Sequence, residues 1–140
     1  MKHAVSALSS VIVLAAVFAA LTGCGGERPY PVRGQLIYED TKQPVKELAG
    51  FNITFTSETL HKSAVGDIDE NGYFQLSHGG AFPGLYKVIL TQPHPNPERA
   101  EHRKPVVDVA YEHPEKSTLT ANVEAKNNEF TFPLKRIGKK

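Results

Sequence analysis

VGDIDENGYFQL, residues 65–76, is the stretch that decides the fold of this chain. Its order Asp-x-Asp-x-Asn-Gly copies the first half of a calcium-binding loop, but such a loop also needs a bidentate glutamate at its twelfth position. The residue there is His78, and the four residues after the glycine alternate like a strand. Asn-Gly is a preferred pair for a tight β-turn, so the stretch predicts a β-hairpin. Its turn residues would be Asp69, Asn71 and Gly72; the alternative calcium ligands would be Asp67, Asp69 and Asn71.

Apolar and polar side chains alternate with a period of two along the rest of the chain. No segment carries an amphipathic helical stripe, and Gly, Pro, Asn or Asp separates most of the alternating runs. About seven short strands divided in this way are typical of a single antiparallel β-sandwich. The expected strands are 32–38, 51–56, 63–68, 73–76, 85–91, 117–125 and 128–135.

Prolines and asparagines mark special positions between and within these strands. Pro133 lies inside the last run, which places that strand at a sheet edge with its missing N–H facing away from the sheet. Asn127 and Asn128 predict a hairpin turn before it, because Asn tolerates positive φ. Pro83 and Gly84 predict another structural turn, over residues 81–84. The Pro-rich segment 92–116 predicts a long loop that crosses from one sheet to the other.

The N-terminus has the features of an export signal. Lys2 precedes an unbroken apolar run at 11–21, which is short for a membrane span. The run ends in Leu-Thr-Gly-Cys24, which resembles the lipobox of bacterial lipoproteins. That resemblance implies cleavage before Cys24 and a lipid-modified cysteine, with a diacylglyceryl thioether and an amide-linked acyl chain such as palmitate. Gly25 after the cysteine suggests the outer membrane. An ordinary secretory signal and an uncleaved anchor are the alternatives.

These features divide the chain into four parts. Residues 1–23 would be a lipoprotein signal peptide, 24–31 the lipidated cysteine and a short tether, 32–136 the β-domain and 137–140 a basic tail. Cleavage would leave 117 of the 140 residues, which suits one domain. The leader has one of the 16 basic residues and none of the 15 acidic ones, so the mature chain would be neutral. This balance predicts no nucleic-acid partner.

Candidate sites for chemistry are few. The histidines form no metal-ligand motif, and zinc held by His94, His102 and His113 is a weak alternative. No Gly-x-Ser-x-Gly nucleophile motif and no phosphate-binding loop are present. The sequence therefore predicts no catalytic residue and no cofactor. An aromatic platform for a glycan would come from Tyr30, Tyr38, Tyr73 and Tyr111, without a tryptophan to support it.

Four motifs in order resemble carboxypeptidase-regulatory-like domains. They are V-x-G-x-L-x-Y from Val32, A-x-G-x-x-D-x-x-G-x-F from Ala64, G-x-x-P-G-x-Y-x-V from Gly80, and a closing hairpin over 117–136. The resemblance implies a seven-stranded transthyretin-like, Ig-like β-sandwich that is mainly non-catalytic. The resemblance does not extend to the zinc peptidase that accompanies this domain in metallocarboxypeptidases, whose zinc motif these residues lack, so no peptidase activity is expected.

These observations predict a lipid-anchored, non-catalytic β-sandwich of the cell envelope. It would sit on the cell membrane or outer membrane through the lipid on Cys24, facing the periplasm or the exterior, and act as a structural or protein- or ligand-binding module. An alternative is a glycan- or peptide-binding accessory domain that serves a partner enzyme. A small metal-dependent hydrolase is the less favoured alternative.

Overall fold

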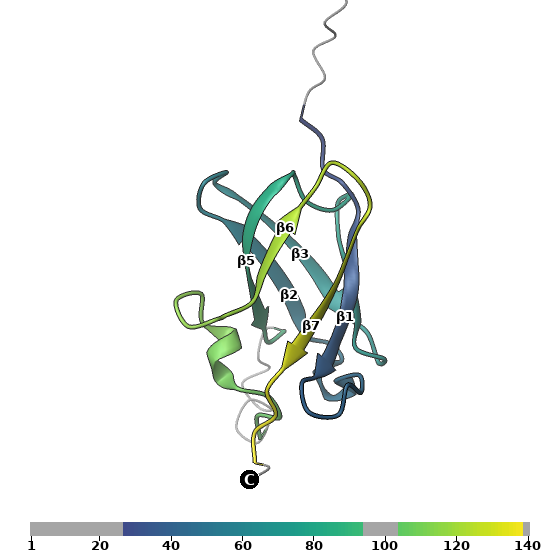
Figure 1. Ribbon diagram of the computed structural model, residues 1–140, viewed down its shortest axis with the longest axis vertical. Helices are drawn as coiled ribbons and strands as arrows, with labels where there is room; N and C mark the ends of the chain where they lie inside the picture. Colours follow the sequence, from purple (N-terminus) through teal and green to yellow (C-terminus); the bar gives the residue numbers. More distant parts are fainter. Residues whose placement is uncertain (1–26, 94–103, 139–140) are drawn as a thin grey trace, which may run out of the picture.

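The computed structural model describes residues 27–93 and 104–138. Within these residues seven strands and two short 3-10 helices surround one apolar core (Figure 1). The strands are β1 (Val32–Tyr38), β2 (Asn52–Ser57), β3 (Lys62–Ile68), β4 (Tyr73–Leu76), β5 (Gly84–Thr91), β6 (Thr120–Val123) and β7 (Asn128–Leu134). The helices are η1 (Lys46–Leu48) and η3 (Val109–Glu112).

The strands form one sheet, in the order β6-β5-β2-β3-β4-β1-β7. The predicted antiparallel sandwich of two sheets is therefore wrong: the single sheet coils until it nearly closes into a barrel (Figure 1). The sheet is also mixed, because β1 pairs with β7 in parallel over its whole length, from Val32 opposite Asn128 to Tyr38 opposite Leu134. All other strand pairs are antiparallel.

Two glycines explain how one sheet can coil so strongly. Gly34 of β1 and Gly66 of β3 are both buried. A Cβ on Gly34 would lie 2.0 Å from the carbonyl oxygen of Phe130, and one on Gly66 would lie 2.2 Å from that of Gln75. Glycine inside a strand marks a tight bend or a close approach of backbones.

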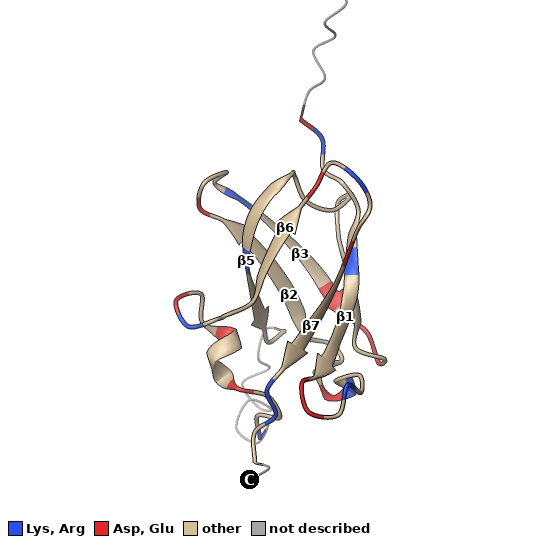
Figure 2. Ribbon diagram, viewed as in Figure 1, with Lys and Arg blue, Asp and Glu red and all other residues tan. Residues whose placement is uncertain are grey.

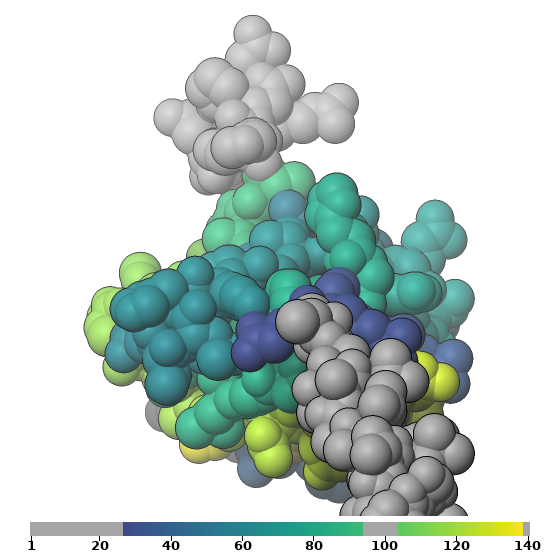
Figure 3. Space-filling model, turned by 90° about the horizontal axis from the view of Figure 1, so that it is seen from above, coloured from purple at the N-terminus to yellow at the C-terminus, as the bar shows by residue number. Residues whose placement is uncertain are grey.

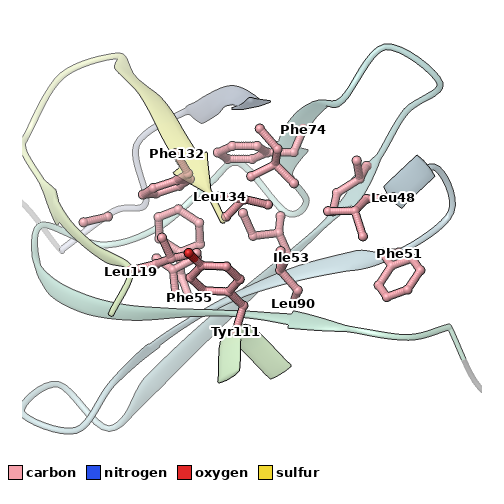
Figure 4. Packing of buried hydrophobic residues seen from close by; sticks show 14 of the residues in the cluster. Leu48, Phe51, Ile53, Phe55, Phe74, Leu90, Tyr111, Leu119, Phe132 and Leu134 are labelled. Carbon is pink, nitrogen blue, oxygen red and sulfur yellow. The ribbon is translucent and has the colours of Figure 1, made fainter. Parts of the chain in front are cut away.

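The core fills the barrel from all sides (Figure 4). Phe55 of β2 is fully buried, and its ring centroid lies 6.1 Å from the rings of Phe74, Tyr86, Phe130 and Phe132. Those rings come from β4, β5 and β7, so one side chain joins strands that are far apart in the sheet. Aromatic pairs at this separation add to the stabilisation that burial alone provides.

β6 and β7 lie at opposite edges of the sheet, on the two sides of the barrel's open seam. They therefore do not pair as a hairpin, and neither Asn127 nor Asn128 has positive φ, so this prediction was wrong. Instead, Asn128 acts through its buried side-chain amide. Its Oδ1 accepts from Glu124 N at 2.9 Å and its Nδ2 donates to Glu124 O at 3.0 Å. The Asn128 side chain thus makes the two hydrogen bonds to the Glu124 backbone that a paired strand would otherwise make at this end of the seam.

The edge position predicted for the strand with Pro133 is confirmed. Asn128 N donates to Pro31 O, and Leu134 O accepts from Glu39 N, so the even-numbered residues of β7 bond toward β1. Pro133 is odd-numbered, and its missing N–H faces the seam. Farther along, Lys135 N donates to the Tyr111 hydroxyl of η3.

The Pro-rich segment does not cross between sheets, contrary to the prediction, because β5 and β6 are antiparallel neighbours. Residues 94–103 of this segment lie outside the described residues. In the described part, Asp108 is the N-cap of η3, and its Oδ1 accepts from Ala110 N at 2.9 Å.

The two ends of the barrel differ in what they carry. Residue 27 lies at one end, beside the loops 58–61, 77–83 and 124–127 (Figures 1 and 3). The opposite end carries η1, η3, the turn between β3 and β4, and the C-terminal segment (Figure 1). Acidic and basic residues are interspersed along the ribbon in the view of Figure 2. Neither 3-10 helix in the described part has the length and apolarity that crossing a membrane requires.

Candidate functional site

Tyr73 is the tyrosine whose side chain the barrel leaves on its surface. It is 53% exposed, whereas Tyr38 and Tyr111 belong to the core at 4% each. Tyr30 is half-buried, with the Arg28 guanidinium 5.1 Å from its ring centroid. The broad platform of four tyrosines that the sequence suggested is therefore reduced to one exposed ring.

The hairpin predicted from residues 65–76 is confirmed, and it holds Tyr73 in place. Asp69 Oδ1 accepts from the backbone N–H groups of Asn71 at 2.8 Å and Tyr73 at 2.9 Å. Gly72 has φ of 72° and donates to Asp69 O. Asp and Asn-Gly are suited to such turns, because the Asp side chain bonds the backbone two residues on and Gly adopts positive φ without strain.

The alternative calcium ligands are parts of the hairpin. Asp67 belongs to strand β3, and Asp69 uses one carboxylate oxygen to cap the turn. No group of three or more acidic, His or Cys side chains in residues 27–93 and 104–138 is placed to hold a metal ion.

A row of polar side chains crosses the outer face of the sheet beside Tyr73. The strand register places Glu129 of β7 opposite Arg33 of β1, Arg33 opposite Gln75 of β4, and Gln75 opposite Asp67 of β3. Arg33 Nε lies 3.7 Å from Glu129 Oε1. A concavity of about 550 Å³ lies along this row, and its lining residues include Arg33, Asp67, Asp69, Tyr73, Gln75 and Glu129.

A second concavity, of about 630 Å³, also has Tyr73 in its lining. It lies toward the end of the barrel that carries η1. Its lining is rich in hydrogen-bonding side chains, namely Gln35, Tyr38, Gln43, Lys46, Glu47, Asn71, Tyr73 and Arg136. We call the surface formed by the two concavities the Tyr73 wall. A ring flanked by amides and charged groups is suited to hold a polar ligand rather than an apolar one.

Arg136 packs on the buried ring of Tyr38 at the floor of the second concavity. The guanidinium carbon lies 3.7 Å from the ring centroid, a cation–π geometry. Burial, the hydrogen bond to the Glu47 carboxylate and the charge of that carboxylate together raise the pKa of Tyr38 to about 12, while Arg136 opposes the shift. The Tyr38 hydroxyl is therefore neutral at ordinary pH and donates to Glu47.

The raised pKa of Tyr38 predicts a specific loss of stability in alkali. Its contribution is fully present below the unfolded value of 10.0 and is lost as the pH rises toward about 12. The shift of roughly two pKa units corresponds to about 2–3 kcal/mol of unfolding free energy. Denaturant unfolding between pH 9 and pH 12 should show this loss in the native chain and a smaller one in Tyr38→Phe. Equal slopes for the two proteins would contradict the assignment.

The other candidate residues lie apart from this wall or outside the described residues. His113 is exposed, and its Nδ1 lies 3.9 Å from Glu115 Oε1. His94, His102 and the proposed anchor Cys24 lie outside the described residues, as does the signal sequence. The predicted turn over residues 81–84 is displaced: the tight turn runs from Ser77 to Gly80, where Gly80 N donates to Ser77 O. Pro83 lies in a bend, and Gly84, with φ of 149°, begins β5.

A third cavity of about 420 Å³ lies between η1 and η3. Its lining includes Leu48, Phe51, Val107, Val109 and Glu112. Gln92 and Lys104 on its rim flank the segment 94–103, which is not described, and we assign no ligand to this cavity.

Sequence reasoning missed most of the wall. Arg33, Gln75 and Glu129 lie at outward-facing positions of their strands, and the alternation of apolar and polar residues does predict this orientation. That they form one row depends on β1 lying between β4 and β7, which no local pattern shows. No protein-family model matches the chain, and no curated protein and no solved structure shows significant similarity to it.

Proposed function

We propose that this chain is a lipid-anchored, non-catalytic binding module of a bacterial cell envelope, which holds a polar ligand on the Tyr73 wall. The observation that carries the proposal is Tyr73 itself. Its ring is exposed, its backbone N–H donates to Asp69 in the turn, and it lines two concavities that carry charged and amide side chains. Aromatic rings with polar neighbours are frequent anchors of binding sites.

The position of the wall suits a protein tethered through its N-terminus. A lipid on Cys24 would lie six residues before Tyr30, whose backbone pairs with Ala81. Six residues reach at most about 20 Å. The end of the barrel with residue 27 would therefore face the membrane, and the end with η1 would face away (Figure 1). The Tyr73 wall opens along the side and toward that far end, where a ligand can approach.

The proposed role does not depend on a reacting group. The wall contains carboxylates, amides and cations, but its Asp69 is engaged in the turn and its Tyr38 hydroxyl donates to Glu47. Binding alone accounts for the arrangement. The chain would hold a component of the envelope, or position it for a partner protein in the same compartment.

Expression of four versions of the chain in a bacterium tests both halves of the proposal. The versions are the native chain, Cys24→Ala, Tyr73→Ala and, as a matched control, Leu85→Ala, which removes an exposed apolar side chain from β5. Membrane fractionation with intact mass measures anchoring. Co-sedimentation of the detergent-solubilised protein with purified cell-wall sacculi measures binding.

The native chain should be membrane-bound with a lipid-sized mass increment on Cys24, and it should sediment with sacculi. Cys24→Ala should no longer fractionate with the membrane but should still sediment with sacculi. Tyr73→Ala should remain membrane-bound and should bind sacculi about tenfold more weakly than the native chain. Leu85→Ala should behave as the native chain. An unlipidated native protein would refute the lipid anchor. Sacculi binding that is unchanged in Tyr73→Ala would refute the assignment of the binding site to the Tyr73 wall.

A further inference from the structure

The two halves of the Tyr73 wall carry opposite charge. In the first concavity Arg33 pairs with Glu129, which leaves the carboxylates of Asp67 and Asp69 as its excess charge. The lining of the second concavity contains two cations, Lys46 and Arg136, and one carboxylate, Glu47, which accepts from the Tyr38 hydroxyl. One half is therefore acidic and the other basic, and Tyr73 lines both.

Arg136 is the cation in the basic half whose hydrogen bonding within the described residues is incomplete. Its Nε is buried and has no hydrogen-bond partner in the described part of the chain. Leaving a buried donor unpaired is costly, more so for a charged group. A carboxylate is the acceptor that a guanidinium binds best, because two parallel N–H···O bonds can form. The amides of Gln35, Gln43 and Asn71 line the same concavity and can donate to the same oxygens.

We infer that the ligand of the Tyr73 wall is a short peptide with a free C-terminal carboxylate, bound in extended form with that carboxylate at Arg136 and Lys46. Its ammonium end lies at Asp67 and Asp69, and its middle crosses the Tyr73 ring. This inference rests on the proposed function and specifies its ligand.

The length of the wall fits such a ligand. Arg33, beside the acidic half, and Tyr38, beneath Arg136, are five residues apart on β1, which is about 16 Å along a strand. An extended peptide of four to five residues covers that distance. A sugar acid would satisfy Arg136 but has no cation for Asp67 and Asp69, so the charge pattern favours the peptide.

Calorimetry with a matched set of peptides tests the inference on the mature chain in detergent micelles. The probe is the tetrapeptide Ala-Gly-Gly-Ala in four forms, with a free or acetylated N-terminus and a free or amidated C-terminus. A tetrasaccharide that contains glucuronate serves as the comparison ligand. The protein variants are Arg136→Gln, Tyr73→Ala and the control Lys116→Gln, which neutralises an exposed lysine on the loop after η3.

The free peptide should bind the native chain about tenfold more tightly than the amidated peptide, since a charge-assisted bidentate pair is lost on amidation. Arg136→Gln should weaken binding of the free peptide by the same factor and leave binding of the amidated peptide unchanged. The variant should therefore bind the free and amidated peptides equally well. Lys116→Gln should change nothing. N-terminal acetylation should weaken binding severalfold, and added salt should weaken the doubly free form most.

Other results would overturn the inference in distinguishable ways. If Tyr73→Ala weakens all four peptides but amidation has no effect, the carboxylate assignment fails and the proposed binding function stands. Tighter binding of the tetrasaccharide than of any peptide would replace the peptide by a sugar acid. If no probe binds while sacculi do, the ligand class is wrong, and if sacculi also fail, the proposed function fails with it. Because amidation alters only the ligand, this test holds even if Arg136→Gln does not fold.

Discussion

Phe55→Ala should lower the free energy of unfolding by about 3–5 kcal/mol, the range for a fully buried phenylalanine. Phe55 is 0% exposed, and its ring meets rings from β4, β5 and β7 at 6.1 Å. The substitution leaves a cavity where these strands meet, and the surrounding rings cannot all move in to fill it, because each is held by its own strand. Denaturant unfolding measures the loss, and the melting temperature should fall by about 15 °C or more.

The matched control for this prediction is Val65→Ala on β3. Val65 is 42% exposed on the outer face, so its loss should change the free energy of unfolding by about 0.5 kcal/mol or less. A loss below about 1.5 kcal/mol for Phe55→Ala would mean that the aromatic cluster does not organise the core.

Gly34→Ala should destabilise the barrel by about 3 kcal/mol or more, because the added methyl group has no space. Its Cβ would lie 2.0 Å from the Phe130 carbonyl oxygen and 2.8 Å from two carbons of the Phe74 ring. The first contact is with backbone, so β7 must move away from β1, and the parallel pairing that nearly closes the barrel is lost. Chemical denaturation measures the loss, and hydrogen exchange should show less protection along β7.

Gly50→Ala separates this steric effect from backbone strain. Gly50 has φ of 82° but nothing within 4 Å of an added Cβ. Its substitution should therefore cost only the strain of a left-handed residue, about 1–2 kcal/mol. If Gly34→Ala is no more destabilising than Gly50→Ala, the close approach of β1 and β7 is not a constraint on the fold.

The strands themselves were predictable because each buries one face, and a period of two records that locally. The bounds of β1 and β4 agree with the alternating runs at 32–38 and 73–76, and the turn between β3 and β4 follows from Asp69 and Asn71-Gly72. The edge position of β7 was also predictable, since Pro133 cannot donate a ladder hydrogen bond.

The arrangement of the strands was not predictable in the same way. A sandwich and a coiled single sheet bury the same alternate side chains, so the pattern favours neither. The difference lies in long-range pairing: β7 lies parallel to β1, and β6 stays unpaired with β7 although only four residues separate them. Asn128 illustrates the point, because its type suggested a turn and its buried amide instead bridges the seam to Glu124.

The candidate site divides along the same line. The sequence by itself determined that Tyr73 follows a rigid turn and alternates outward on its strand, because both properties depend on neighbouring residues. Only the tertiary structure decided that Tyr38 and Tyr111 are buried, that Arg136 lies on the Tyr38 ring, and that the acidic and basic halves meet at Tyr73. The physical reason is that local backbone geometry determines the face of the strand on which a side chain lies. The order of the strands in the sheet determines which residues of other strands become its neighbours.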